Sequence, residues 1–279
     1  MARRLAEAGY SLVVHDINPA ALKPLAKLGA RVAHSACEVA DEATAVFVSL
    51  PAPAILREVS LGANSIAMGK KAKIVVDLST TGSAIEKEVA AGLAKKRITL
   101  IDAPVSGGVG GATAGTLTFM VGGPEAAFAK AKPILEKMGK NIVHAGESGN
   151  GQAAKICNNM ILGISMIAVS EGFMLGKRLG LDAQKLFNVV STASGSCWSL
   201  VNYCPVPGPV PTSPANRDYQ AGFTAAMMLK DLLLAQQASA SAGAATPLGA
   251  EAAQLFSLFV NSGNSAKDFS GIIKMLDGK

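Results

Sequence analysis

The pattern of apolar residues changes near the middle of the 279-residue chain, and this change limits the folds that the chain can adopt. Through residue 148, short apolar runs typical of buried strands alternate with segments of helical composition and spacing. Such an alternation predicts an α/β domain with a doubly wound parallel sheet covered by helices. From Gln152 onward the strand-like runs disappear, and long segments rich in alanine, leucine and methionine predict an all-helical half. We therefore expect two domains, residues 1–148 and residues 149–279.

The expected elements of the first half follow its apolar runs. Strands are expected at residues 11–15, 45–50, 74–77, 99–103, 116–121 and 141–144, and helices at 20–28, 83–95 and 124–138. This order is typical of a Rossmann-type, dinucleotide-binding domain. In the second half, residues 153–180 are apolar nearly all round and must be covered on every side, which predicts a homodimer or homotetramer. Residues 204–214, rich in proline and glycine, are expected to form a loop between helices.

Composition argues against several classes of function. The formal charge of +6 comes from scattered lysines, and aromatic residues make up only 5% of the chain, so no nucleic-acid partner is expected. The longest apolar stretch, residues 160–170, ends at Glu171, short of the roughly 20 residues that span a membrane, so no membrane partner is expected. The 4 cysteines form no close pair of metal-binding type and the 3 histidines lie far apart, which predicts reduced thiols and no metal site.

A lysine and an asparagine share one face at the start of the long apolar segment. Within Gly149-Asn150-Gly151-Gln152-Ala153-Ala154-Lys155-Ile156-Cys157-Asn158-Asn159, Lys155 and Asn159 lie one helical turn apart. Burial among the surrounding alanines would lower the pKa of the Lys155 ammonium, toward a value at which it can exchange a proton with an alcohol. The alternative is that Lys155 lies at the solvated edge of an amphipathic helix.

Two further segments offer groups that can bind an anion. Ser106, Gly107 and Gly108 follow the expected strand at 99–103, and the hydroxyl and backbone N–H groups of such a loop can hold a carboxylate. A tight turn in which the glycines take positive φ would explain the same residues. Lys230 offers a second cation on an expected helix, although an ordinary solvated charge there needs no function.

Together these segments resemble the β-hydroxyacid dehydrogenase family. The similarity runs along almost the whole chain and is carried by four motifs in order, at residues 102–108, 115–123, 149–160 and 216–232. It implies NAD-dependent oxidation of 3-hydroxyisobutyrate to methylmalonate semialdehyde in valine degradation. Reduction of glyoxylate, succinic semialdehyde or tartronate semialdehyde is the alternative activity within the family. The resemblance further implies the mitochondrial matrix in a eukaryote or the cytoplasm in a bacterium.

The resemblance also assigns roles in the expected reaction. Oxidation of a primary alcohol requires a base within hydrogen-bonding reach of the hydroxyl as hydride leaves for the nicotinamide, and Lys155 is the candidate general acid/base. Asn159 would bind the substrate or orient the lysine, while the other substrate contacts would anchor the carboxylate. The expected substrate-binding residues are Ser106, Gly107, Gly108, Asn159 and Lys230.

The expected contacts of the NAD cofactor lie mainly at strand ends. Asp16 directly follows the strand at 11–15, at the position where an acidic residue of this fold binds the adenosine ribose. The lack of an arginine at this turn favours NAD over NADP. The alternative is that Asp16 only opens the turn that follows. Family members contact the nucleotide at positions that correspond here to Leu50, Pro51, Thr80 and Lys230. Ile55 departs from the family pattern, which often has asparagine there, so a contact at this position is doubtful.

One part of the dinucleotide fold is expected to be missing. The glycine-rich turn precedes the ribose-binding acidic residue by about 20 residues, which places its first glycine before Met1. Residues 1–9 instead have the pattern of the first helix, with Gly9 at its C-terminal end. The glycines at 107–115 cannot replace the turn, because they are expected to lead into a strand and not into a helix. A shortened cofactor unit is expected, with a non-catalytic binding protein as the alternative function.

Overall fold

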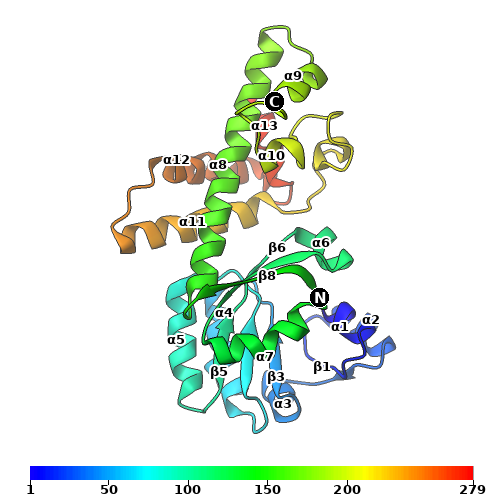
Figure 1. Cartoon of the computed structure of the whole chain (residues 1–279), viewed down its shortest axis with the longest axis vertical. Helices are drawn as coiled ribbons and strands as arrows, with labels where there is room; N and C mark the ends of the chain where they lie inside the picture. The colour runs from blue at the N-terminus through cyan, green and yellow to red at the C-terminus, as the bar shows by residue number, and fades with distance from the viewer. Residues whose placement is uncertain (279) are drawn as a thin grey trace. The chain divides into compact units, whose positions relative to one another are not determined.

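The computed structural model describes residues 1–278, which fold into two compact units. The N-terminal unit comprises Met1–Lys155, and the C-terminal unit begins at Ile156. The division falls inside helix α8 (Asn150–Arg178), the longest helix in Figure 1. It lies a few residues beyond the boundary at residue 148 that the change in sequence pattern suggested.

The main sheet of the N-terminal unit is mixed. Its strands are β3 (Ala45–Val48), β4 (Ile74–Asp77), β5 (Thr99–Asp102), β6 (Val105–Ser106), β7 (Leu117–Gly122) and β8 (Gly139–Gly146). Strands β3, β4 and β5 pair in parallel, as do β7 and β8, but β7 is antiparallel to both β5 and β6. The Rossmann-type fold is confirmed, but the sheet is mixed, whereas the sequence pattern predicted a parallel sheet. After β6 the chain turns back to pair with its neighbour as a hairpin does, without the crossover over the sheet that parallel strands need.

Helices cover both faces of this sheet, as the sequence pattern predicted (Figure 1). Neighbouring residues on a strand point to opposite faces. Val75 packs with residues of α4 (Pro53–Leu61) and α5 (Ser83–Ala94), while Val76 packs with residues of α7 (Glu125–Leu135). The two faces therefore bury two separate apolar cores.

Several short elements were not predicted. Helix α3 (Ala36–Glu42) begins at Ser35, whose hydroxyl accepts a hydrogen bond from the Glu38 N–H, and α4 begins with Pro53, so both carried an ordinary start signal. The glycine-rich segment forms α6 (Gly108–Ala114) before β7 begins. The expectation that these glycines lead directly into a strand was wrong: a helix of one to two turns fits between the two strands of the hairpin.

A separate pair of strands precedes the main sheet. Helices α1 (Ala2–Glu7) and α2 (Pro19–Lys27) flank β1 (Val13–Val14), which pairs in parallel with β2 (Arg31–Val32). Within residues 1–278, no strand connects β1 to β3, and the unit holds two sheets.

The C-terminal unit contains helices and turns but no strand among its described residues, as predicted. Besides α8 it comprises α9 (Ala183–Val190), α10 (Trp198–Val201), α11 (Ala225–Ala242), α12 (Pro247–Phe259) and α13 (Ile272–Leu276), with one-turn segments at Pro214–Arg217, Val260–Asn264 and Phe269–Gly271. Residues 204–214 form the expected loop, which the Ser213 hydroxyl closes by donating to the Cys204 carbonyl.

Helix α8 is longer than its apolar stretch suggested, because it continues through Glu171 to Arg178. It is the one helix of the described chain whose length and hydropathy would suit a membrane span, and 39% of its most apolar window is buried. Met166 lies in a core formed with α11 and α12, and Phe173 lies in a second core with Leu200 and Tyr219. These contacts identify α8 as the central helix of the unit's own core.

Candidate active site

The expected cofactor contacts Leu50 and Thr80 come together at the carboxyl ends of β3 and β4. The Leu50 N–H donates to the Ser79 hydroxyl at 2.8 Å, and the Leu78 N–H donates to the Val48 carbonyl at 2.8 Å. Pro51 follows on the exposed side. Ligands of open α/β sheets bind at this edge, so the geometry is compatible with a nucleotide here.

Asp16 lies exposed at the end of β1. One of its carboxylate oxygens accepts a hydrogen bond from the Asn18 N–H at 2.7 Å. This bond is the one expected of a residue that opens a turn. The second carboxylate oxygen takes no part in it, so the turn role and a ribose-binding role are compatible.

Lys155 is buried in the second turn of α8, with 7% of its surface exposed. This burial contradicts the alternative of a solvated helix edge. Asn159 follows one turn later and is 1% exposed. Burial of both polar side chains on one helix face requires polar surroundings.

The first turn of α8 is fixed by Asp102 at the end of β5. Its two carboxylate oxygens accept hydrogen bonds from the N–H groups of Gly149 and Gln152, at 2.7 and 2.8 Å. A carboxylate suits this position because the first N–H groups of a helix lack partners within it. Burial raises the pKa of Asp102, and the two N–H groups oppose that rise. A Cβ at Gly151 would collide with the Met120 carbonyl oxygen, which explains why glycine stands there.

Gln152 joins this turn to the loop after β4. Its amide oxygen accepts from the N–H groups of Thr81 and Gly82, at 3.0 and 3.1 Å. Its amide nitrogen donates to the Ser79 carbonyl at 2.9 Å and to the Glu86 carboxyl at 3.0 Å. Gln152 is fully buried, and these four bonds use both its donors and both its acceptor positions.

Glu86 is the fully buried partner of Gln152 in the first turn of α5. Burial and the neighbouring Asp77 carboxyl raise the pKa of Glu86 to about 11, so its side chain is neutral near pH 7. Gln152, Glu86 and Asp77 were not predicted as site residues. A signal existed: Asp77 and Asp102 end two adjacent strands in the same register.

Glu86→Gln is expected to make the free energy of unfolding less dependent on pH than it is in the wild type. A carboxyl whose pKa is raised on folding contributes stability that is complete below its unfolded pKa and is lost as pH rises toward the folded value. The wild-type chain should therefore lose up to about 3 kcal/mol between about pH 6 and about pH 8 relative to the variant. Urea unfolding at both pH values measures this difference. Glu251→Gln, at an exposed carboxyl of α12, is the control, and parallel pH profiles of wild type and Glu86→Gln would contradict a neutral Glu86.

The expected anion-binding segment lies at the end of β6. Ser106 is half-buried and pairs in register with Thr118, whereas Gly107 and Gly108 are exposed. Gly107 has φ of 127° and Gly108 of 60°, so both take the positive values of the tight-turn alternative. A turn of this kind directs backbone N–H groups to one side, which is compatible with carboxylate binding.

In the C-terminal unit, Asn159 and Lys230 meet through Asp231. The Asn159 amide donates to one oxygen of the Asp231 carboxylate, and the Lys230 amine lies 3.1 Å from the other. Asp231 is 2% exposed, so its charge is offset by Lys230 inside the unit. Asp231 was not predicted as a site residue. A shallow pocket of about 320 Å³ beside Lys230 is lined by Ala226, Leu229, Lys230, Leu233, Leu234 and Gln237.

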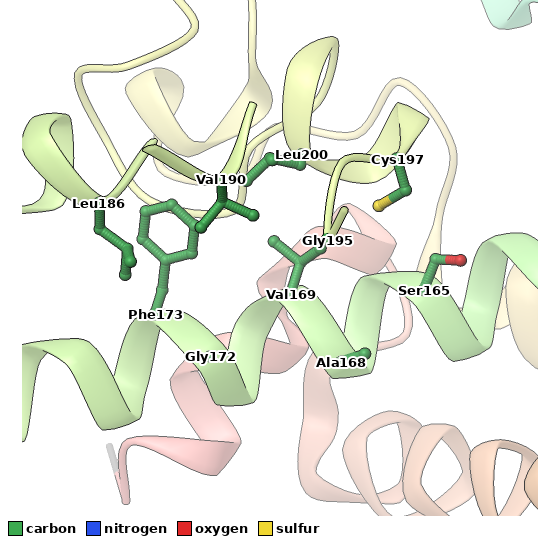
Figure 2. A pocket seen from close by; sticks show the side chains of 10 residues that line it. All are labelled: Ser165, Ala168, Val169, Gly172, Phe173, Leu186, Val190, Gly195, Cys197 and Leu200. Atoms are coloured by element: carbon green, nitrogen blue, oxygen red, sulfur yellow. The ribbon is translucent and has the colours of Figure 1, made fainter. Parts of the chain in front are cut away.

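A larger pocket of about 420 Å³ lies elsewhere in the C-terminal unit (Figure 2). Residues of α8, α9 and the segment around Cys197 line it, and most of its lining is apolar. Figure 2 shows Phe173 between Leu186 and Val190, with Ser165 and Cys197 toward the other end. None of the expected site residues lines this pocket.

Two family models match the chain in tandem. Residues 1–146 match the NAD-binding domain of 6-phosphogluconate dehydrogenase, and residues 149–276 match the NAD-binding domain of NADP-dependent 3-hydroxyisobutyrate dehydrogenase. The matches cover both halves of the chain, and both models describe parts of nicotinamide-dependent dehydrogenases.

Curated relatives and solved structures agree with these matches. A probable mitochondrial 3-hydroxyisobutyrate dehydrogenase of Dictyostelium discoideum is 46% identical, covering 98% of this chain and 85% of its own. A probable 3-hydroxyisobutyrate dehydrogenase of Mycobacterium tuberculosis is 44% identical, covering 99% and 93%. The solved Mycobacterium tuberculosis 3-hydroxyisobutyrate dehydrogenase with L-serine is 43% identical with a TM-score of 0.92, covering 99% of this chain and 94% of that one. The similarity thus spans both units.

Proposed function

Because the chain belongs to the 3-hydroxyisobutyrate dehydrogenases, NAD(P)-dependent enzymes of the β-hydroxyacid dehydrogenase family, we propose that it oxidises 3-hydroxyisobutyrate to methylmalonate semialdehyde in valine degradation, with NAD as cofactor. The observation that carries the proposal is the buried Lys155 in the second turn of α8, followed one turn later by the buried Asn159. The burial of this lysine counts against the alternative of a non-catalytic binding protein. In a eukaryote we expect the enzyme in the mitochondrial matrix, and in a bacterium in the cytoplasm.

Lys155 is proposed as the general acid/base. In the oxidation, the Lys155 amine takes the hydroxyl proton of the substrate, while a hydrogen on the carbon that bears this hydroxyl leaves as hydride. Bound NAD supplies the hydride acceptor. Asn159 would bind the substrate or orient the lysine, and the hydrogen bond that its amide donates to Asp231 holds the amide in place.

The cofactor is assigned to the sheet edge of the N-terminal unit. Leu50, Pro51 and Thr80 would contact the nucleotide at the ends of β3 and β4, and Asp16 would bind the adenosine ribose. Lys230 is assigned to the cofactor as well as to the carboxylate. A carboxylate at position 16 and no arginine beside it favour NAD over NADP.

Ser106→Ala and Lys230→Ala are expected to raise the KM for the hydroxy acid by about tenfold, more than they change the affinity for NAD. Both side chains would meet a carboxylate whose charge is present in the ground state and in the transition state alike, so their loss weakens binding more than chemistry. Steady-state kinetics with each substrate varied in turn measures the effect. The amide of the substrate serves as the control, and equal turnover of acid and amide by the wild type would exclude an anion site.

The C-terminal unit is proposed to associate with a second copy of the chain. Large apolar side chains are exposed along this unit, among them Ile161, Leu175, Leu179, Val189 and Leu248, each at least 61% exposed. Exposed apolar surface of this extent is typical of an interaction face. A homodimer or homotetramer would cover it, and sedimentation that shows only monomer at micromolar concentration would exclude both.

A further inference from the structure

The hydrogen bonds of the buried Gln152 side chain join two segments with different roles in the proposed reaction: one contacts the cofactor, and the other carries the general acid/base. The loop at residues 79–82 follows β4 and carries Thr80, the proposed cofactor contact. Gln152 lies three residues before Lys155 on α8. We propose that Gln152 is a positioning residue, which fixes the Thr80 loop to the first turn of α8 and thereby sets the place of Lys155 relative to the cofactor. The proposal rests on the proposed role of Lys155.

The bonds of Gln152 enclose Thr80 from both sides. The amide nitrogen donates to the carbonyl of Ser79, just before Thr80, and the amide oxygen accepts from the N–H groups of Thr81 and Gly82, just after it. Only a side chain with a donor and an acceptor on one planar group can make these bonds together. A carboxylate could not donate to the Ser79 carbonyl, and an ammonium could not accept from the two N–H groups.

Glu86 completes the arrangement from α5. The neutral Glu86 carboxyl accepts from both the Gln152 amide and the Thr81 hydroxyl, at 3.0 and 2.9 Å. Its neutrality matters because a buried negative charge beside Asp77 would repel that carboxylate. Glu86 is therefore placed to hold Gln152 in the one orientation that serves the loop.

Two further contacts fix the same turn of α8. The Asp102 carboxylate accepts the N–H groups of Gly149 and Gln152, and the Ser83 hydroxyl donates to the Gly149 carbonyl at 2.8 Å. The turn is thus held from β5, from α5 and from the loop after β4. Because a helix is stiff over one turn, a shift of this turn displaces Lys155, and displacement of a reacting group by about 1 Å can cost about a hundredfold in rate.

Gln152→Glu tests the proposal, because it keeps the size of the side chain but replaces the amide NH₂ and its two donors with a carboxyl, which has at most one donor when it is neutral. The variant should accelerate amide hydrogen exchange in residues 79–82 and in residues 149–155, and lower kcat at least about tenfold while the KM for 3-hydroxyisobutyrate changes by less than about threefold. The double variant Gln152→Glu/Glu86→Gln exchanges the two groups, so that the amide at position 86 can donate to the carboxyl at position 152. It should therefore recover part of kcat. Gln184→Glu, the same change at an exposed site of α9, should leave both readouts at their wild-type values.

The outcomes separate this proposal from the proposed function. Unchanged exchange, or faster exchange in residues 79–82 alone, would overturn the connection between the two segments. Faster exchange in both segments with a wild-type kcat would overturn the positioning role. A wild-type protein without 3-hydroxyisobutyrate turnover would count against the proposed function, and hydrogen exchange alone would then decide whether Gln152 joins the segments. Should Gln152→Glu not fold, Gln152→Met, similar in size and uncharged, carries the same comparison.

Discussion

Replacing Lys155 with alanine is expected to lower kcat for 3-hydroxyisobutyrate by at least about a hundredfold while NAD affinity stays nearly unchanged. The lysine is the proposed proton acceptor, and a positioned acid/base group typically contributes factors of about 10²–10⁴. Lys155 lies in the second turn of α8, next to the first turn that Gln152 and Asp102 hold, so its replacement removes the reacting group and leaves the sheet edge intact. Steady-state kinetics at saturating NAD gives kcat, and calorimetric titration gives the NAD affinity.

Lys185→Ala is the matched control, because it removes an exposed lysine of α9 without touching the site. Its kcat should equal that of the wild type. A Lys155→Ala enzyme that keeps more than about a tenth of its kcat would show that the proton goes to another group. Circular dichroism of both variants separates lost catalysis from lost folding.

The second large effect concerns the binding of the NAD pyrophosphate. Adding a strand and a glycine-rich turn before Met1 of the 279-residue polypeptide is expected to raise its NAD affinity by about a hundredfold or more. Backbone N–H groups of such a turn and the first helix dipole bind a pyrophosphate, and hydrogen bonds to charged groups contribute about 1.5–3 kcal/mol each. The added strand would also offer a partner to the edges of β1 and β3 that take no part in the pairs β1–β2 and β3–β4.

Calorimetric titration of the two polypeptides with NAD measures this difference. The extended chain with each glycine of the turn replaced by valine is the control, because it supplies the strand but prevents close approach of the backbone to the pyrophosphate. Hydrogen exchange should show the N-terminal unit of the shorter polypeptide loosened and its helical unit folded. Micromolar NAD binding by the 279-residue polypeptide itself would contradict this interpretation of residues 1–16.

Local sequence signals predicted most of the elements that position the site. The strand at 74–77 has the predicted bounds, and α5 begins at the predicted Ser83, because a short apolar run followed by a helical pattern needs no distant partner to be recognised. The antiparallel β7 could not be predicted in this way. The direction of a strand depends on which neighbour it pairs with, and Leu117–Gly122 has the same apolar pattern whether it runs up or down the sheet.

The sequence alone determined that Lys155 and Asn159 share a helix face, because that relation follows from four residues of spacing and from the apolar character of the segment. It also determined the two-part organisation, since strand and helix periods differ. Only the tertiary structure decided which groups hold the first turn of α8, which precedes these residues. Asp102, Glu86 and Gln152 lie up to 66 residues apart in sequence and meet because β4 and β5 end, and α5 begins, at one edge of the sheet. Burial at that edge makes Glu86 neutral and gives Gln152 its four partners, and neither property can be read from residues whose neighbours in space are distant along the chain.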